Sequence, residues 1–315
     1  METLIYIKAV ADITRLRLLS ILLSFELSVN EIVTLLEMGQ SRISRHLKIM
    51  TDAGLLECRR DGTWAFYFAV ASGPAREFID SIKYTFAKEP LFQIDIHRTE
   101  QIIQARKLAT MRFFNDIASG WDLLKKEILG DFDLNEAILQ EMDQCDVAVD
   151  MGCGTGELME KLKSVARNVI GVDSSSKMLE QARKRFSPGN VNFDLRLGEL
   201  EHLPLKNGEA DCAVISMVLH HLSTPEKIIS EIRRVLREKG ILIIADFDKH
   251  EDEGMRKTYG DRWLGFSVEE ISGMLKRNGM NIEKIRSFKI RKKLNLNLIK
   301  SIMSPSFHSA TRGEI

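Results

Sequence analysis

The chain has 315 residues, and its 45 lysines and arginines balance 45 aspartates and glutamates. The net charge of the whole chain therefore gives no indication of a polyanionic partner. The length predicts two domains, and no apolar run approaches the roughly 18–20 residues that span a bilayer. Four well-separated cysteines without a Cys-x-x-Cys pair, and an N-terminus without a signal-peptide pattern, lead us to expect a soluble, cytoplasmic protein.

Residues 1–70 are expected to form a helical unit closed by a hairpin. The run Ser28-Val-Asn-Glu31 has the form of a capping box, which starts a helix. Gly54 is placed to end a later helix, and Asp61-Gly62 is a strong hairpin signal. The expected elements are helices over 4–10, 13–23, 28–36 and 40–53, and strands over 55–60 and 63–68.

Helix, short turn, helix and an arginine-bearing hairpin are typical of a winged helix-turn-helix, whose second helix enters the DNA major groove. The segment resembles the ArsR-type repressor family in four stretches: 12–19, 26–31, 41–48 and 54 through the wing. The resemblance implies a homodimer that binds a double-stranded DNA operator with an inverted repeat. A degenerate winged helix used only for dimerisation is the alternative. The expected DNA-binding residues are Ser41, Arg42, Ser44, Arg45, His46, Lys48, Arg59 and Arg60.

Metal sensing does not carry over from this resemblance. Many ArsR-type repressors have Glu-Leu-Cys-x-Cys-Asp-Leu before the recognition helix, where this chain has Ser28 and Asn30 in place of the two cysteines. A hydroxyl and an amide cannot replace two thiolates for a soft ion. Cys58, alone on a strand, is expected in the core. We therefore expect no metal site.

Two helices, over 75–88 and 98–117, are expected around a turn at Pro90. The first lies where ArsR-type proteins place a dimerisation helix. Its apolar side chains would face either a partner or the domain's own core. These side chains are Phe78, Ile79, Ile82 and Phe86.

The most informative stretch is Val147 to Gly156, an apolar run that turns into a glycine-rich loop. Glycines at alternate positions let the backbone approach a ligand, and the helical spacing of 157–165 directs free N–H groups to the same place. A second apolar run ends at Asp173, where a ribose diol finds its acceptors. The pattern predicts a nucleotide-type site, and a glycine turn serving packing alone is the alternative.

The third glycine comes one position earlier than in the dinucleotide fingerprint, and Asp150 precedes the loop. That carboxylate would repel a pyrophosphate but suits a ligand with an ammonium group. The stretch resembles motif I of class I methyltransferases that use S-adenosylmethionine (SAM), and the resemblance continues in family order over about half the chain. It implies an α/β fold, Rossmann-like, with a mostly parallel seven-stranded sheet that binds SAM or S-adenosylhomocysteine (SAH). The further matching runs are 171–179, 198–205, 210–222 and 239–246.

The resemblance assigns ribose binding to Asp173, adenine binding to Glu199 and a place facing the sulfonium to Ser216. The full set of expected cofactor-binding residues is Asp150, Gly152, Gly154, Gly156, Asp173, Ser174, Met178, Gly198, Glu199, Leu200 and Ser216. Residues 113–122 resemble the segment that folds over SAM in small-molecule methyltransferases, and simple helix packing is the alternative.

Catalytic residues stay unassigned. His220 and His221 could supply a general base, but such residues more often cap a helix or pack. The motif of amino-methyltransferases that act on bases or glutamine is absent after Ser216, which disfavours a base as acceptor. A polar cluster past the fifth strand could bind an acceptor, cap the cofactor site or form a solvated helix. It comprises Asp246, His250, Glu253, Arg256, Arg262 and Trp263.

The expected domains are 1–88 for DNA binding and dimerisation, 89–140 as helical linker and cofactor lid, 141–290 as the methyltransferase domain, and 291–315 as a basic tail. Residues 284–312 contain basic side chains and no acid, which indicates either a nucleic-acid contact or a solvated tail. Two functions fit: a transcriptional regulator with SAM or SAH as effector, or an active small-molecule methyltransferase that the winged helix targets or regulates.

Overall fold

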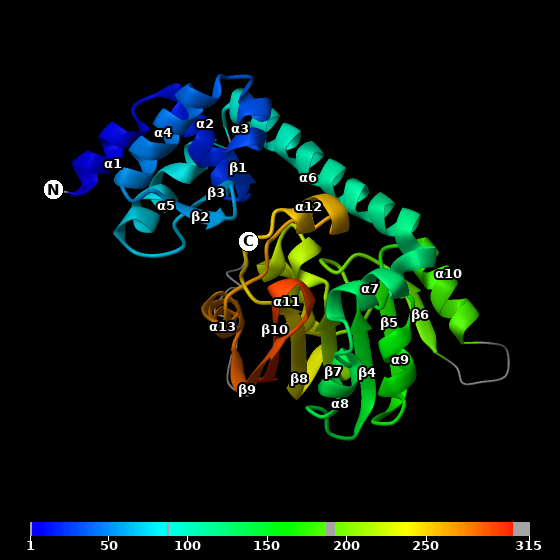
Figure 1. The fold of residues 1–315 in the computed structure, drawn as a ribbon. Helices are drawn as coiled ribbons and strands as arrows, with labels where there is room; N and C mark the ends of the chain where they lie inside the picture. The colour runs from blue at the N-terminus through cyan, green and yellow to red at the C-terminus, as the bar shows by residue number, and fades with distance from the viewer. Residues whose placement is uncertain (1, 87, 187–192, 305–315) are drawn as a thin grey trace. The chain divides into compact units, whose positions relative to one another are not determined.

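The computed structural model describes residues 2–86, 88–186 and 193–304 (Figure 1). The chain divides into two compact units, Met1–Lys107 and Leu108–Ile315. In the described part of the chain, no helix combines the length and the apolar character needed to cross a bilayer.

The first unit has the expected helices and hairpin, with ends within two residues of most predicted bounds. The predicted capping box is confirmed, since Glu31 N donates to Ser28 Oγ and Ser28 N donates to Glu31 Oε2 at 2.8 Å. The strands form an antiparallel sheet in the order β1-β3-β2. The elements are α1 (Glu2–Val10), α2 (Ile13–Leu22), β1 (Leu27–Ser28), α3 (Val29–Leu36), α4 (Gln40–Asp52), β2 (Leu56–Asp61), β3 (Trp64–Ala69) and α5 (Pro74–Phe86).

The apolar face of α5 packs in the unit's own core. Ile79 and Phe86 are buried there, and Phe78 and Ile82 pack against the same cluster. The expectation for Cys58 is wrong: this thiol is exposed.

A single helix, α6 (Pro90–Ile117), replaces the expected one that began at residue 98. Pro90 starts it, because the first turn of a helix needs no N–H from its first residue. The expected separate segment 89–140 does not form a unit of its own, since α6 begins in the first unit and ends in the second. The first turns of α6 are bound to α2, because Arg17 of α2 donates two hydrogen bonds of 2.7 and 2.8 Å to the buried carboxylate of Asp95 in α6.

The second unit is an α/β fold with a mostly parallel seven-stranded sheet, as predicted, and the strand order is β6-β5-β4-β7-β8-β10-β9. Strands β4 to β8 are parallel, and β10 is antiparallel to both of its neighbours. The strands are β4 (Cys145–Met151), β5 (Ala166–Asp173), β6 (Asp194–Leu197), β7 (Ala210–Ser216), β8 (Leu236–Phe247), β9 (Met280–Lys289) and β10 (Asn295–Met303). The helices are η1 (Ala118–Gly120), α7 (Trp121–Leu129), α8 (Leu134–Leu139), α9 (Glu157–Leu162), α10 (Ser176–Arg185), η2 (Leu219–His221), α11 (Pro225–Val235), α12 (Gly254–Tyr259), α13 (Val268–Arg277) and η3 (Arg291–Lys293).

The expected basic tail at 291–315 is wrong for its first part. Strand β10 lies between β8 and β9, where Leu296, Leu298 and Ile299 are buried (Figure 1). Leu294, Leu296 and Leu298 alternate with Asn295 and Asn297, as is typical of a strand, and this outweighs the basic composition. Lys284 and Arg286 are not a free basic patch either, since both pair with Glu141. Residues 305–315 lie outside the described residues.

Candidate functional site

The glycine-rich loop follows β4 at the carboxyl edge of the parallel strands. Gly152, Gly154 and Gly156 have φ values of 77°, 53° and 80°, a left-handed conformation that favours glycine. A Cβ at Gly152 would lie 2.5 Å from Val218 Cγ2, so no side chain fits there. Gly152 N and Cys153 N donate to Val172 O and anchor the loop to β5. The loop therefore presents bare backbone.

Asp173, the last residue of β5, holds the turns on either side of it. Gly154 N donates to its Oδ2 at 2.9 Å, and Ser175 N donates to its Oδ1 at 2.7 Å. Burial raises the pKa of Asp173, and these hydrogen bonds partly oppose the shift. Each carboxylate oxygen has a second lone pair, so one acceptor position on each stays available for a hydroxyl.

Asp150 lies in β4 and is buried, beside β5 and β7. Burial raises its pKa to about 7; the positive charge of Lys125 opposes this shift and the negative charge of Asp173 adds to it. A buried carboxyl of this kind is poised to ionise when a cationic group comes near.

The remaining predicted cofactor residues come from the same sheet edge. Gly198 N donates to Asp173 O at 3.0 Å, which brings the turn after β6 next to the end of β5. Ser216 is half-buried at the end of β7, whose neighbour in the sheet is β4. Ser174 and Glu199 are exposed, whereas Met178 and Leu200 are buried.

Residues 113–122 lie against this edge. Asn115 Oδ1 accepts a 2.7 Å hydrogen bond from Ser175 Oγ, and Asp122 Oδ1 accepts one of 2.6 Å from Thr155 Oγ1 in the glycine loop. The indole of Trp121 is the nearest group to Gly154 on its open side, 3.6 Å from where a Cβ would stand. Sequence reasoning named this segment but missed the Asp122 contact, which carries no motif.

The two histidines after β7 are buried rather than exposed to a pocket. His220 Nδ1 lies 2.5 Å from Asp246 Oδ1 at the end of β8. Burial lowers the pKa of His220, but the charges of Asp246 and Asp261 outweigh it, so the net shift is upward. Burial holds the pKa of His221 well below its usual value. The expected solvated helix is wrong for Asp246 and Trp263, which are both buried.

The predicted DNA-binding residues are mostly exposed. Ser41, Arg42, Ser44, Arg45 and Lys48 share the exposed face of α4. His46 is a correction: it is buried on the opposite face, with Nδ1 3.8 Å from Asp12 Oδ1, so it cannot reach DNA directly. Its spacing from Ile43 and Met50 puts it on the core side of the helix.

The two wing arginines differ. Arg60 is exposed. Arg59 lies with both ends of its guanidinium 3.1 Å from the carboxylate of Glu26, a bidentate pair that offsets its charge. Sequence spacing could not show this partner, which is 33 residues away.

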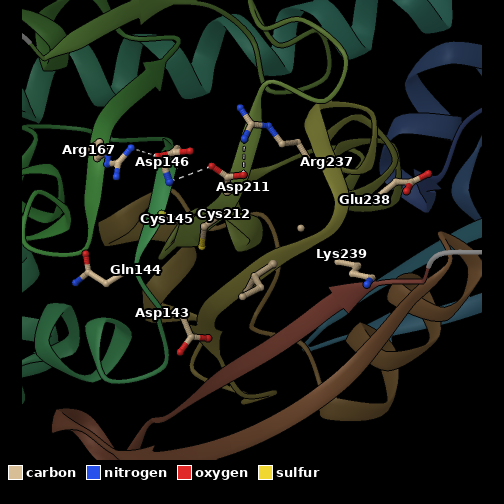
Figure 2. Close-up of a pocket in the computed structure, with 12 residues that line it drawn as sticks. Asp143, Gln144, Cys145, Asp146, Arg167, Asp211, Cys212, Arg237, Glu238 and Lys239 are labelled. Atoms are coloured by element: carbon tan, nitrogen blue, oxygen red, sulfur yellow. Dashed lines mark hydrogen bonds and ion pairs between the residues drawn. The ribbon is translucent and has the colours of Figure 1, made fainter.

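One pocket of about 440 Å³ opens at the other edge of the sheet, where β4 and β7 begin (Figure 2). Two of its acids are paired with bases, with Asp211 Oδ1 2.7 Å from Arg237 Nη1 and Asp146 Oδ1 3.1 Å from Arg167 Nη1. Parallel strands place their beginnings and ends at opposite edges, so this pocket is separate from the glycine loop.

Asp150 generates a pH prediction. Its pKa of about 7 in the folded chain lies above the ordinary value of 3.8, so the folded state binds more protons between these values. Stability of the second unit therefore falls as pH rises from about 4 to 7, and Asp150→Asn flattens this slope. The measurement is urea unfolding at pH 5 and 7.5 in a Trp64→Phe background, in which the fluorescence of Trp121 and Trp263 reports the unfolding of the second unit. The exposed Asp131→Asn is the control, and equal slopes in all three proteins would contradict the prediction.

Comparison with known proteins adds to this geometry. The model for "Bacterial regulatory protein, arsR family" matches residues 12–57, and the model for "Methyltransferase domain" matches residues 149–244. An uncharacterised 37.1 kDa protein in transposon TN4556 of Streptomyces fradiae is 40% identical over 104 residues, covering 32% of this chain and 30% of that protein. The ubiquinone/menaquinone biosynthesis C-methyltransferase UbiE of Campylobacter jejuni is 32% identical over 136 residues, covering 41% of this chain and 56% of the relative.

These matches therefore span between about a third and just over half of the relatives' own length. Among solved structures, a chain of the complex between the Haloferax volcanii Trm112 methyltransferase activator and a methyltransferase aligns with a TM-score of 0.51 at 17% identity, over 59% of this chain and 96% of that one. At this identity the likeness shows the fold. Residues 12–57 of the chain therefore match an ArsR-family regulatory segment, and residues 149–244 match a methyltransferase domain.

Proposed function

We propose that the protein is a cytoplasmic, homodimeric transcriptional regulator whose methyltransferase domain binds SAM or SAH as an effector of operator binding. The observation that carries this is α6, one helix whose two ends contact the helix-turn-helix and the glycine-loop edge respectively. An effector acts only by binding two states of a protein unequally, and a shared helix offers the element whose equilibrium both ligands bias.

The contact to the helix-turn-helix is specific. Arg106 Nη2 of α6 lies 2.5 Å from Glu31 Oε1, and the other oxygen of Glu31 caps the start of α3. Both side chains are largely buried. A displacement of Arg106 therefore acts on the first helix of the DNA-reading pair.

The other end of α6 contacts the cofactor edge. Asn115 accepts from Ser175, which caps α10 and whose own N–H holds Asp173. Phe113 lies 3.1 Å from where a Cβ of Gly260 would stand. A ligand on Asp173 therefore alters the surroundings of the last turn of α6.

The residues at the sheet edge fit SAM or SAH. The glycine loop gives backbone room for the amino-acid part, Asp173 keeps two acceptor positions for ribose hydroxyls, and Asp150 suits an ammonium group. Bound SAM supplies an electrophilic methyl group. This chain's residues hold and shield it: Trp121 and Asp122 cover the loop, and Ser216 lies at the end of β7.

A dimer is supported by α1, which exposes three apolar side chains, Leu4, Ile5 and Ile7, between 43% and 54%. Such a row on one short helix is more typical of an interface than of a free surface. A two-fold dimer accounts for an inverted-repeat operator with half-sites about one helical turn apart.

A second function, methyl transfer to a small molecule, is favoured by the similarity to UbiE and by the buried His220–Asp246 pair, whose carboxylate orients the imidazole. Methyl transfer needs mainly an acceptor placed in line, so few catalytic groups are required. Release of SAH from SAM in the presence of candidate acceptors distinguishes turnover from sensing.

Asp173→Ala should weaken SAM and SAH binding by about 2–4 kcal/mol, or roughly 30- to 1,000-fold, because two charge-assisted bonds to ribose are lost. Isothermal calorimetry measures this, with the exposed Asp131→Ala as control and circular dichroism as a check on folding. Unchanged SAH affinity in the Asp173 variant would remove the proposed site.

Arg45→Ala and Arg60→Ala should weaken DNA binding in different ways. Arg45, on the exposed face of α4, is placed to reach a base edge, and its loss should cost about 1–3 kcal/mol and relax preference at one position per half-site. Arg60 on the wing should meet phosphate, so its loss weakens all sequences alike and lowers the salt slope by about one. Arg59→Ala should have a smaller effect, since Glu26 offsets its charge. Footprints and binding curves on operator and scrambled DNA measure these effects. If the intact protein shows no preference for the operator, the regulator function is contradicted and methyl transfer is the remaining function.

Arg106→Met should uncouple the two sites while leaving each able to bind. Allosteric coupling of about 1–3 kcal/mol corresponds to a 5- to 150-fold change in operator affinity with ligand, and this ratio should fall toward one in the variant. Arg98→Met is the control, because Arg98 lies on the same helix and pairs with Glu37 at an exposed position. Fluorescence anisotropy of labelled operator with and without SAM or SAH measures the ratio; equal ratios in wild type and Arg106→Met would refute this route.

A further inference from the structure

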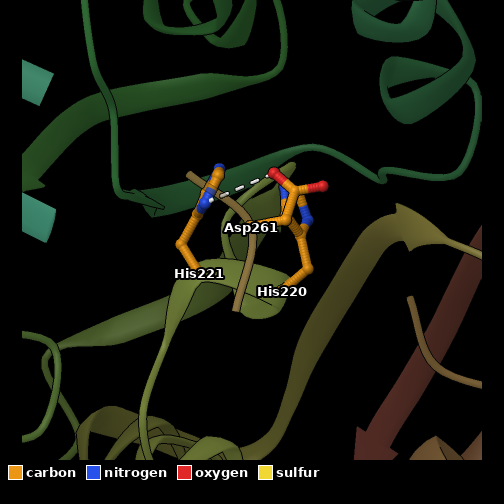
Figure 3. A group of neighbouring side chains, drawn as sticks. All are labelled: His220, His221 and Asp261. Carbon is orange, nitrogen blue, oxygen red and sulfur yellow. Dashed lines mark ion pairs between the residues drawn. The ribbon is translucent and has the colours of Figure 1, made fainter. Parts of the chain in front are cut away.

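Two histidines and an aspartate form a buried cluster in the second unit (Figure 3). His220 and His221 lie on η2, directly after β7, and Asp261 follows α12. Asp261 Oδ1 lies 3.7 Å from His220 Nε2 and 3.7 Å from His221 Nδ1. One ligand atom from each residue falls within 4.8 Å of the others.

The cluster lacks hydrogen bonds that its burial demands. Within the described residues, both carboxylate oxygens of Asp261 and Nε2 of His221 are buried without a hydrogen-bond partner. All three side chains are at most 3% exposed. A buried carboxylate without a donor is costly, so this arrangement requires a group that the protein itself does not supply.

The surroundings fix the cluster in place. Asp246 Oδ1 lies 2.5 Å from His220 Nδ1, which leaves Nε2 directed toward Asp261. Backbone N–H groups of Arg262 and Trp263 both donate to His220 O, so the segment with Asp261 is held against η2. A carboxylate on the far nitrogen of an imidazole is the usual support of a metal-ligating histidine.

We propose that His220, His221 and Asp261 bind a divalent transition-metal ion. Two imidazole nitrogens and one carboxylate oxygen are a donor set that suits Zn²⁺ and its first-row neighbours. Ligand atoms about 2.0 Å from a tetrahedral ion stand about 3.3 Å apart, whereas the three ligand atoms here lie within 4.8 Å of one another, so binding contracts the cluster around the ion.

The charges agree with a dication. Asp246 and Asp261 bring two negative charges into a buried region, and the nearby Arg256 is paired with Glu253 at 3.1 Å. Three protein ligands leave a fourth position for water or for an oxygen or nitrogen atom of a small molecule. This site is not the cysteine site of metal-sensing ArsR-type repressors, whose two cysteines this chain lacks. The proposal does not depend on the proposed function.

The test uses the full-length protein after treatment with a chelator. Zn²⁺ is titrated against a chromophoric competitor, and Co²⁺ serves as a spectroscopic probe. Wild type should take up one ion per chain, with visible Co²⁺ d–d bands and no thiolate charge-transfer band, and its unfolding temperature should rise with Zn²⁺. A wild-type chain that takes up no stoichiometric ion overturns the proposal and leaves a proton shared between Asp261 and His220 as the alternative.

Variants then assign the ligands. Asp261→Asn and His221→Gln should each weaken binding at least tenfold, and Asp246→Asn should weaken it about 10- to 100-fold through His220. The controls are His97→Gln, at an exposed histidine on α6, and Asp131→Asn, at an exposed aspartate; both should retain wild-type affinity. Wild-type affinity in Asp261→Asn would overturn the assignment, and the wild-type titration stands even where a variant fails to fold.

Discussion

The carboxylate of Asp173 is the constraint on which the second unit's ligand edge depends. It accepts one backbone N–H from the glycine loop and one from the turn before α10, so it joins the ends of β4 and β5 into one surface. Ser175, held by the same carboxylate, in turn holds Asn115 at the end of α6. The residue that is expected to read the ribose is thus also the residue that positions the loop and the helix around it. Binding and scaffold are not separable at this position.

Much of the fold followed from local patterns because each pattern has a local cause. The Ser28–Glu31 box caps α3 through groups three residues apart, and the left-handed glycines at 152, 154 and 156 match a turn that no side chain would allow. The mostly parallel seven-stranded sheet was instead predicted from the resemblance to class I methyltransferases. The placement of Asp150, Asp173 and Ser216 at one edge follows from that topology.

What the sequence could not show arises from contacts between distant residues. The Arg59–Glu26 pair, the burial of His46 against Asp12, and Asp261 beside His220 join positions 33 or more residues apart, and none has a motif. Composition misled at 291–304, where Leu294, Leu296 and Leu298 alternate with Asn295 and Asn297. This alternation sets the strand, and Lys300 pairs with Asp143 from far earlier in the chain. Partner choice required the tertiary structure.

The position of β10 between β8 and β9 also sets the order in which the second unit can be completed. Strand β9 is synthesised before β10, yet β9 pairs in the sheet with β10. The apolar strand β8 therefore has an unpaired edge until β10 has been synthesised. An unpaired edge of this kind invites pairing with other chains. The first unit ends at residue 107, so it can fold before residues 295–303 have been made. During synthesis the DNA-reading unit would therefore be assembled before the unit proposed to control it, and shielding of the β8 edge is where a chaperone would matter most.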